Sequence, residues 1–328
     1  MLEIRHRAMA CDFVVMMRDE GPFADAVLDR LEHIDALESM LSIYKTNSEI
    51  SRINRATTGT PVKVSSDAFW VIERAIELSA RTGGAFDISA GPLIDAWGFT
   101  ERQGRKPSRE EIESARQRVG FQHIEVSRPD RTVALSLPGM SLNLGAIGKG
   151  FAIDWLANEL HAIGVMNFLI HAGSSSVMAH GNQFEAASNN DDDDAPKGWL
   201  VGLLHPTKPS RRLGGIWLHN AALSTSGSGK QFFHHRGKRY GHVIDPRTGE
   251  PSGDGLSITI TTASALEADA LATALFVMGR AAKRENESLR SIPAIWTRPT
   301  RRQDEIEVTA TGDWTWAETP RELTSVQA

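Results

Sequence analysis

The pair of residues with the clearest chemical potential is Asp269 and Thr273, in the segment Ser257–Gly279. Residues four apart on a helix project from one face, with about 5–6 Å between their Cβ atoms. A carboxylate and a hydroxyl at this spacing, among small neighbours such as Ala270 and Ala272, would give a hard cation two oxygen ligands. The alternative is that Asp269 complements the positive end of its helix while Thr273 bonds back to the preceding turn.

Lys149 lies in a second segment of this kind, the glycine-rich run Asn143–Asp154 (NLGAIGKGFAID). Glycines around a lysine at the start of a helix can cradle a phosphate through backbone N–H groups, the positive helix end and one ammonium. The run is not a Walker A loop, because Asn143 stands where the first glycine belongs and Gly150 where Ser or Thr belongs. A strand-to-helix turn with glycines for close packing and a solvated lysine would give the same pattern.

His242 is the candidate general base, because a histidine that titrates near neutrality is the usual group for drawing a proton from a hydroxyl. It precedes a short strand that begins at Val243 and enters a turn at Asp245 and Pro246. Asp245 could orient this histidine or bind a metal. A histidine beside a turn can equally be a structural hydrogen-bonding group.

A fourth segment, Thr82–Phe99 (TGGAFDISAGPLIDAWGF), combines glycines with Phe86 and Trp97. Glycines free the backbone for tight turns, and the two aromatic rings offer flat apolar faces. The segment could cover the ring of an aromatic ligand, or it could pack a loop against the core.

Capping residues and apolar periodicity predict the helices that would position these groups. Ser264 with Glu267 has the spacing of a capping box at the start of the helix that carries Asp269. The other expected helices run over about 22–41, from Ser65 or Ser66 to Arg81, from Ser108 to near Gly120, and over Phe151–Ile163. Strands are expected at Cys11–Met17, Asn167–His171, Trp199–Leu204, Gly215–His219 and Ala294–Thr297. Many strands are joined by hairpin-like turns, so the sequence predicts an α+β fold of mixed, largely antiparallel sheets with packed helices.

Length and composition limit the possible classes of protein. The 328 residues can bury a large core, and we expect a single domain over 1–328, with its core at about 7–280 and a C-terminal extension over 281–328. A formal net charge of −5 argues against nucleic acid as the main partner. Cys11 is the only cysteine, which excludes internal disulfides and multi-cysteine zinc sites.

Two further features concern location and surface. No apolar run approaches the roughly 18 residues of a membrane span, and the first residues show no export signal, so we expect a cytoplasmic protein. The run at 189–196 contains four consecutive aspartates but lacks the spaced ligands and the glycine of a calcium loop. We expect it to be a solvated acidic surface loop.

Several segments, in this order, resemble the FAD:protein FMN transferase family (ApbE-like flavin transferases). The resemblance extends from about Arg7 to Gly279, with Met9, Ala10 and Cys11 at the family's Met-Gly-Thr position. It is carried by LSIYKTNSEISRIN (41–54), GGAFDISAGPL (83–93), WGF (97–99), LGAIGKGFAID (144–154), NFLIHAG (167–173), STSG (224–227), GHVIDPRTG (241–249) and ADALATALFVMG (268–279).

The resemblance implies a two-part architecture, with FAD in the cleft between the parts and Mg²⁺ at its pyrophosphate. It implies that the metal ligands are the Asp269 carboxylate, the Thr273 hydroxyl and the Ala146 carbonyl. The flavin contacts that it implies are Met9, Tyr44, the backbone of Ala85, Phe86 and Asp87, Asn143, Lys149 and Val243. His242 matches the family histidine beside the flavin phosphate.

The expected activity is Mg²⁺-dependent transfer of FMN from FAD to a Thr or Ser hydroxyl of an acceptor protein, with release of AMP. His242, oriented by Asp245, would take the hydroxyl proton, and Lys149 would stabilise charge on the phosphates. Two alternatives stay open, namely an Mg²⁺-dependent FAD pyrophosphatase that yields FMN and AMP, and a catalytically silent FAD-binding protein.

Departures from the family pattern motivate these alternatives. Asn143 stands where many members have Asp, which removes one negative charge beside the pyrophosphate. Ser228, Gly229 and Gln231 stand where the family commonly has Asp or Asn, Tyr and Arg. Ser174 replaces the second glycine of a Gly-Gly pair.

Overall fold

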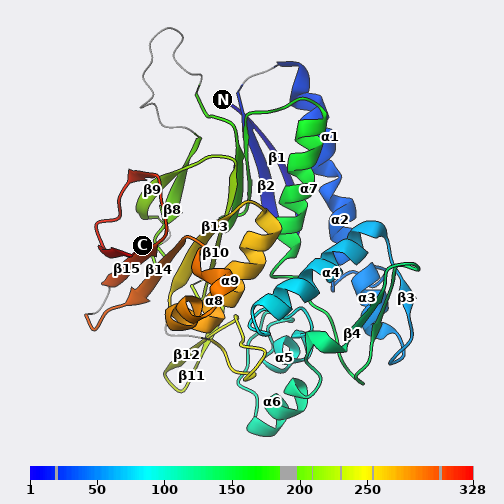
Figure 1. Ribbon diagram of the computed structural model, residues 1–328. Helices are drawn as coiled ribbons and strands as arrows, with labels where there is room; N and C mark the ends of the chain where they lie inside the picture. The colour runs from blue at the N-terminus through cyan, green and yellow to red at the C-terminus, as the bar shows by residue number, and fades with distance from the viewer. Residues whose placement is uncertain are drawn as a thin grey trace.

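The computed structural model describes residues 1–18, 21–184, 198–208, 210–229, 231–252, 255–302 and 305–327, so the acidic run at 189–196 lies outside the described residues. Within them the fold is α+β, as predicted, with mostly antiparallel sheets and packed helices (Figure 1). No helix in these ranges is both long and apolar enough to cross a membrane.

A nine-stranded sheet forms the centre of the molecule, in the order β1-β2-β6-β7-β10-β13-β14-β15-β17 (Figure 1). Its neighbouring strands pair antiparallel, except that β15 and β17 are parallel. The strands are β1 (Leu2–Ala8), β2 (Cys11–Met17), β6 (Phe168–Ala172), β7 (Ser176–His180), β10 (Ala221–Gly227), β13 (Ser257–Thr262), β14 (Ala294–Pro299), β15 (Ile306–Thr311) and β17 (Leu323–Gln327). The last three strands come from the segment expected to be a C-terminal extension, and they complete the central sheet.

Two helices on one face of this sheet carry the candidate site, α7 (Gly148–Ala162) and α8 (Ala265–Glu285). They pack against each other and against β7, with α7 also on β6 and α8 on β10 and β13. α1 (Ala24–Glu32) lies beside α7 and β1. Side chains between these helices and the sheet belong to the largest hydrophobic cluster of the molecule.

A smaller sheet covers the opposite face. Its strands are β16 (Trp316–Glu318), β9 (Arg212–Leu218) and β8 (Trp199–Leu204), in that order. Alternation along β6 separates the two faces, because Phe168 and Ile170 belong to the cluster under the helices while Leu169 packs in the cluster with Trp199 and Val201 of β8. The central sheet is therefore sandwiched between helices and a second sheet.

The second part of the molecule packs beside α7 and α8 (Figure 1). It contains α3 (Glu49–Arg55), α4 (Ser66–Arg81), α5 (Gly91–Ala96), α6 (Arg109–Arg116) and the sheet of β3 (Val62–Lys63), β5 (Thr132–Leu135) and β4 (Ile124–Ser127). The remaining elements are η1 (Gly21–Phe23), α2 (Ile34–Leu41), η2 (Phe121–His123), α9 (Glu287–Arg290) and the hairpin of β11 (Phe232–His235) and β12 (Lys238–Gly241).

Local signals located the helix starts well. Ser65, Ser108 and Ser264 each accept a hydrogen bond from the backbone N–H three residues on, so all three predicted N-caps are confirmed. The helix predicted over 22–41 is instead divided at His33, whose ring stacks on Trp155 with centroids 4.9 Å apart. The helix that begins after Ser108 ends at 116, earlier than predicted.

Candidate functional site

The Asp269 carboxylate is the centre of the candidate site and is buried, with 4% of the residue exposed. Its Oδ1 accepts hydrogen bonds from the hydroxyls of Ser176 (2.6 Å) and Ser224 (2.7 Å) on neighbouring strands β7 and β10. Its Oδ2 accepts the Gly150 N–H at 2.8 Å and lies 3.5 Å from the Lys149 ammonium. One cation and three donors therefore compensate this buried charge, as burial of a carboxylate requires.

Thr273 lies one turn further along α8. Its hydroxyl donates to the Asp269 carbonyl at 3.1 Å and lies 3.1 Å from the Ser226 hydroxyl. Thr273 thus bonds back to the preceding turn, which is the structural role that the sequence left open. A hydroxyl that donates one proton still has two acceptor lone pairs, so this bond is compatible with a role as metal ligand.

Ala146 lies in the turn before α7. The Gly150 N–H would ordinarily bond to the Ala146 carbonyl four residues back, but it donates to Asp269. No hydrogen bond to the Ala146 carbonyl is found in the described part of the chain. This carbonyl is therefore available to another partner.

These oxygen groups fit a hard cation. Asp269 Oδ2, the Thr273 hydroxyl and the Ala146 carbonyl are the ligand types that Mg²⁺ prefers. No cluster of three or more His, Cys, Asp or Glu side chains suited to a metal occurs among the described residues, so a cation here would depend on the carbonyl and the hydroxyl as well as the carboxylate. Lys149, now beside Oδ2, is the group that would turn away to admit it.

The glycine-rich turn has fewer free N–H groups than the sequence suggested. Its N–H groups are donated within the chain, from Gly145 to the Asn143 side chain, from Ile147 and Gly148 to the Leu144 carbonyl, and from Gly150 to Asp269. These four N–H groups already have acceptors within the chain, which favours the alternative of a packed strand-to-helix turn. A phosphate at this turn would be met chiefly by the Lys149 ammonium.

Gly150 serves close packing, as the alternative interpretation of this run proposed. A Cβ atom at this position would lie 2.2 Å from the Ala265 carbonyl oxygen, a distance that real contacts do not reach. The start of α7 and the first turn of α8 thus touch through their backbones. This contact brings the Gly150 N–H to Asp269.

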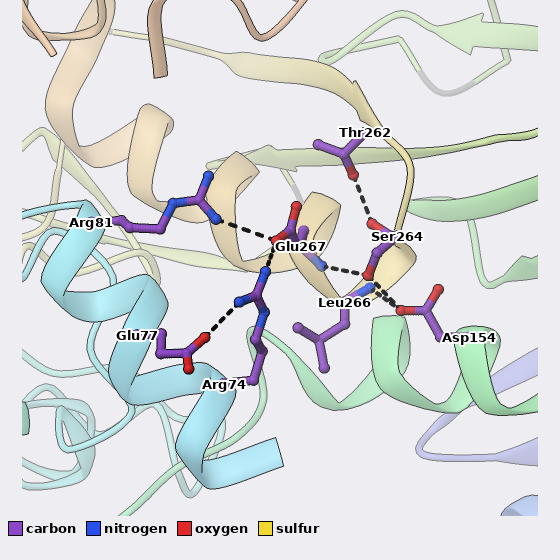
Figure 2. A network of polar contacts seen from close by, with 8 residues as sticks. All are labelled: Arg74, Glu77, Arg81, Asp154, Thr262, Ser264, Leu266 and Glu267. Carbon is purple, nitrogen blue, oxygen red and sulfur yellow. Dashed lines mark hydrogen bonds and ion pairs between the residues drawn. The ribbon is translucent and has the colours of Figure 1, made fainter. Parts of the chain in front are cut away.

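Asp154 caps α8 from the neighbouring helix α7 (Figure 2). Its carboxylate accepts hydrogen bonds from the N–H groups of Ala265 (2.7 Å) and Leu266 (3.0 Å) and from the Ser264 hydroxyl (2.6 Å). Burial raises the pKa of Asp154, and these three hydrogen bonds oppose the rise. Because Asp154 follows Lys149 on one helix and the capped turn leads to Asp269 on the other, this cap fixes the two site residues relative to each other.

Glu267 connects the same turn of α8 to α4 (Figure 2). Its carboxylate pairs with Arg74 and with Arg81, the latter at 3.2 Å. The predicted capping box is therefore only half formed, because Ser264 accepts the Glu267 N–H at 3.3 Å while the Glu267 side chain binds arginines. The reason is that α4 brings two guanidinium groups to this carboxylate.

The loop that follows α4 is buried over residues 84–90. Ala85 and Phe86 are 1% and 2% exposed. The Asp87 carboxylate accepts the N–H (2.8 Å) and hydroxyl (2.7 Å) of Ser89 and the Phe121 N–H (2.9 Å), and burial raises its pKa. The side chains of this loop are therefore committed to the core, and the flavin contact expected of its backbone stays a prediction.

Two other groups define the surroundings of this loop. The Asn143 N–H donates to the Ile88 carbonyl at 2.7 Å, so the loop lies beside the glycine-rich turn. Trp97 is fully buried, and its indole N–H donates to the Gly249 carbonyl at 2.8 Å. Phe86 and Trp97 thus pack the loop against the core, which is the structural alternative for this segment.

The His242 ring is held by the Gln231 carbonyl, which lies 3.1 Å from Nδ1 and also accepts the His242 backbone N–H at 3.1 Å. A carbonyl only accepts, so Nδ1 carries the proton and Nε2 keeps a free lone pair. Burial lowers the pKa of His242, and the positive charge of Lys149 adds to this effect, against the hydrogen bond to Gln231. A neutral imidazole with an open Nε2 is the form that a general base needs.

Asp245 does not orient His242. Both of its carboxylate oxygens bind Arg247, through the backbone N–H, Nε and Nη2, each at 2.9 Å. The expectation of an Asp245–His242 contact is corrected to a Gln231–His242 contact. The arginine two residues on, inside the same turn, reaches the carboxylate at less conformational cost than a histidine three residues back.

The other expected flavin contacts differ in their burial. Met9 is half-buried against the core in the tight turn between β1 and β2, where its φ is 49°. Tyr44 is 63% exposed as a whole residue. Val243 is buried, and its carbonyl accepts the N–H (2.8 Å) and hydroxyl (3.0 Å) of Ser252.

Three serines of the site were missed as site residues. Ser224 and Ser226 are two residues apart on β10, so both side chains face α8. The STSG motif could have indicated them. Ser176 carried no signal, because it reaches Asp269 only through the pairing of β7 with β10.

The fold and the site together define a flavin transferase architecture. The flavinyl transferase ApbE from Pseudomonas stutzeri is similar with a TM-score of 0.79 and 26% sequence identity, over 94% of this chain and 94% of that one. The ApbE protein from Thermotoga maritima is similar with a TM-score of 0.76 and 28% identity, over 90% of this chain and 93% of that one.

The chain belongs to the ApbE family, whose family model matches residues 9–296. A protein named FAD:protein FMN transferase from Haemophilus influenzae is 30% identical over 290 residues, which cover 85% of this chain and 81% of the relative. The protein of that name from Escherichia coli is 32% identical over 252 residues, covering 75% and 69% respectively.

Proposed function

We propose that this chain is an Mg²⁺-dependent FAD:protein FMN transferase, which moves FMN from FAD to a Thr or Ser hydroxyl of an acceptor protein and releases AMP. The observation that carries the proposal is the neutral His242 with its open Nε2, within the electrostatic reach of Lys149, which itself lies beside Asp269. A base, a cation for phosphate and a carboxylate for metal thus occupy one region. Membership of the ApbE family, whose relatives carry this name, supports the same activity.

In the proposed reaction, His242 Nε2 takes the proton of the acceptor hydroxyl while the hydroxyl oxygen attacks the phosphorus on the FMN side of the pyrophosphate. The bond from that phosphorus to the AMP oxygen breaks, so FMN becomes a phosphoester of the acceptor and AMP leaves. The Gln231 carbonyl keeps the Nδ1 proton in place and stabilises the imidazolium as it forms. Lys149 offsets the negative charge of the phosphates.

Asp269, Thr273 and the Ala146 carbonyl are the residues that would hold Mg²⁺, which would supply positive charge to the pyrophosphate oxygens. The proposed flavin contacts are Met9, Tyr44, Asn143, Val243 and the backbone of 85–87. Tyr44 is exposed, and its ring is suited to stacking on a flavin.

Product analysis tests this function. The full chain is incubated with FAD and Mg²⁺, with and without a peptide that contains a threonine acceptor. AMP together with a flavinylated peptide is the expected result. AMP and free FMN in both samples would identify a pyrophosphatase instead, and intact bound FAD throughout would identify a silent binder.

A further inference from the structure

The charge of the chain is unevenly distributed around His242. The protein as a whole carries a formal net charge of −5, yet the sequence contains no Asp or Glu between Asp194 and Asp245. Five of the residues from His234 to Arg239 are His, Lys or Arg (HHRGKR). These residues form the tip of the β11–β12 hairpin, which projects near α5 in Figure 1.

Aromatic packing holds the β11–β12 hairpin against the rest of the molecule. Phe233 and Tyr240 face each other across the two strands and stack at a centroid distance of 5.3 Å. Both rings also lie against the buried Trp97, at 6.2 and 5.5 Å. The turn uses Arg236 and Gly237, both with positive φ, as two-residue hairpin turns require. The cationic side chains therefore stand on a fixed backbone.

Among the described residues, no acidic side chain pairs with the cations of the hairpin. Arg236 and Lys238 are exposed, and in the described part of the chain no hairpin residue forms an ion pair. The Lys238 ammonium lies over the Tyr240 ring at 5.3 Å, where Lys106 from the loop between α5 and α6 also lies at 5.7 Å. The Arg239 guanidinium lies 4.0 Å from the centroid of Phe232. Aromatic faces hold the charges of Lys238, Lys106 and Arg239 in place without neutralising them, and Arg239 also donates a hydrogen bond to the Ser228 carbonyl.

Both ends of the hairpin meet at the proposed base. β12 runs directly into His242, and the residue before β11, Gln231, supplies the carbonyl that holds the His242 ring and backbone. An acceptor that brings a hydroxyl to His242 Nε2 therefore approaches the point from which both strands of this cationic hairpin extend. Exposed charges act over a Debye length of about 8–10 Å at physiological salt, which spans a few residues on each side of the acceptor hydroxyl.

We propose that the β11–β12 hairpin is the docking surface for the acceptor protein, and that it selects a segment with acidic residues flanking the Thr or Ser. The proposal rests on the proposed transferase function and names the chemistry of its protein partner. Complementary charge at the rim of a site steers association and rejects partners of the wrong sign. Acidic flanks would be attracted by Arg236, Lys238, Arg239 and Lys106, and basic flanks repelled.

The test measures the binding of two synthetic threonine peptides, identical except for three Asp or three Lys beside the threonine, to the full chain saturated with FAD. Fluorescence anisotropy gives each dissociation constant at low and physiological salt. We expect the Asp peptide to bind about tenfold more tightly than the Lys peptide, with a difference that shrinks as salt rises. In the double variant Arg236→Glu, Lys238→Glu the preference is expected to reverse.

A matched control carries Lys63→Glu, on β3, with Arg131→Glu, in the turn before β5. Both residues are exposed cations, so the control changes the net charge by the same amount. This control is expected to keep the wild-type preference. Circular dichroism confirms that both double variants are folded. An unchanged preference in the hairpin variant, or equal binding of both peptides by the wild type, overturns the proposal.

Two further measurements distinguish a hairpin that docks protein from one that binds a membrane, and docking from catalysis. If the hairpin variant loses binding to phosphatidylglycerol vesicles while its peptide preference is unchanged, the hairpin binds membranes and the proposal is wrong. AMP release and peptide flavinylation are recorded separately. Charge-dependent peptide binding without transfer would contradict the transferase function but support the docking surface. Transfer without charge-dependent binding would support the transferase function but contradict the docking surface.

Discussion

Asp269 supports more neighbouring groups than the other candidate site residues do. The change Asp269→Ala would leave the Gly150 N–H and two serine hydroxyls without their acceptor, and Lys149 without its counter-ion. We expect the free energy of unfolding to fall by about 2–4 kcal/mol, because buried donors without partners are costly. Mg²⁺-dependent AMP release should also be lost.

Thr273→Val is the cleaner probe of the metal site, because it keeps the side-chain volume and removes only the hydroxyl. We expect stability to change by less than about 1 kcal/mol while the Mg²⁺ concentration for half-maximal activity rises about tenfold. Urea unfolding and Mg²⁺ titration measure the two effects. Wild-type stability in Asp269→Ala, or an unchanged Mg²⁺ titration in Thr273→Val, would contradict these assignments.

His242 should determine the acid limb of the pH profile. Burial lowers its pKa below the ordinary value of about 6.5, so the base is neutral at pH 7 and the rate should fall only when the pH drops below that lowered pKa. The unfolded chain binds this proton more readily than the folded chain, so His242 also makes stability fall as the pH decreases from about 6.5 toward the folded pKa.

The measurement is the pH dependence of transfer in the wild type and in His242→Ala. Loss of the base should slow transfer by about 10²–10⁴-fold and remove this acid limb, with FAD binding retained. The result against this role would be a His242→Ala profile that keeps the same limb.

Ala10 is held in an unfavourable backbone conformation. It is exposed at the β1–β2 turn with φ at 61°, next to Met9 with φ at 49°. A residue with a Cβ atom in this region costs about 1–2 kcal/mol, and glycine avoids that cost at some entropic expense. We expect Ala10→Gly to raise the free energy of unfolding by about 0.5–1 kcal/mol in urea titrations. A lower value than wild type would show that the turn relaxes in solution.

At the level of elements, the contact between α7 and α8 holds the site together. Asp154→Ala removes the acceptor for two N–H groups at the start of α8, and we expect a loss of about 1–3 kcal/mol in stability. Because the cap also fixes Asp269 relative to Lys149, the half-saturating Mg²⁺ concentration should rise about tenfold. Urea unfolding and Mg²⁺ titration are the measurements.

Ser108→Ala provides the matched control for Asp154→Ala. Ser108 caps α6, away from the α7–α8 contact, so its loss should cost about 1 kcal/mol with no change in the Mg²⁺ titration. Equal Mg²⁺ shifts in the two variants would mean that the effect of Asp154 is one of general stability.

The elements also show what a sequence can predict. Helix starts at Ser65, Ser108 and Ser264 were predictable because capping depends on residues three positions apart. Asp269 and Thr273 were predictable as a pair because residues four positions apart lie on one face of a helix. Ser176 was not, because strand pairing brings it to Asp269 from 93 residues away. Glu267 and Asp245 were misassigned because each carboxylate pairs with an arginine. The partner of Glu267 comes from another helix, and the partner of Asp245 comes from the same turn.

At the level of the whole molecule, the C-terminal segment is part of the central sheet. β14 pairs with β13, which supports α8, and its Ile295 packs with Val308 of β15 in the second hydrophobic cluster. Removal of residues 291–328 would expose one edge of β13 and take Ile295, Ile306, Val308 and Ala310 out of that cluster. We expect a chain without cooperative thermal unfolding, measured by circular dichroism.

Deletion of 323–328 alone serves as the comparison, since it removes only the edge strand β17. This shorter chain should still fold, at a reduced melting temperature. A chain that ends at residue 290 and melts like the wild type would show that the segment is dispensable. This dependence could not be predicted from the sequence, because the order of strands in a sheet is set by tertiary pairing.

The ion pair between Lys149 and Asp269 has a consequence for the order of folding and metal binding. A buried carboxylate without a counter-ion would destabilise a newly made chain, because an uncompensated charge opposes the final packing of the core. Here the Lys149 ammonium is the counter-ion of Asp269, so the chain can complete its folding without a bound metal cation. Binding of the proposed Mg²⁺ would then be reversible in the folded protein, and chelation of the metal should leave the chain folded and able to bind Mg²⁺ again.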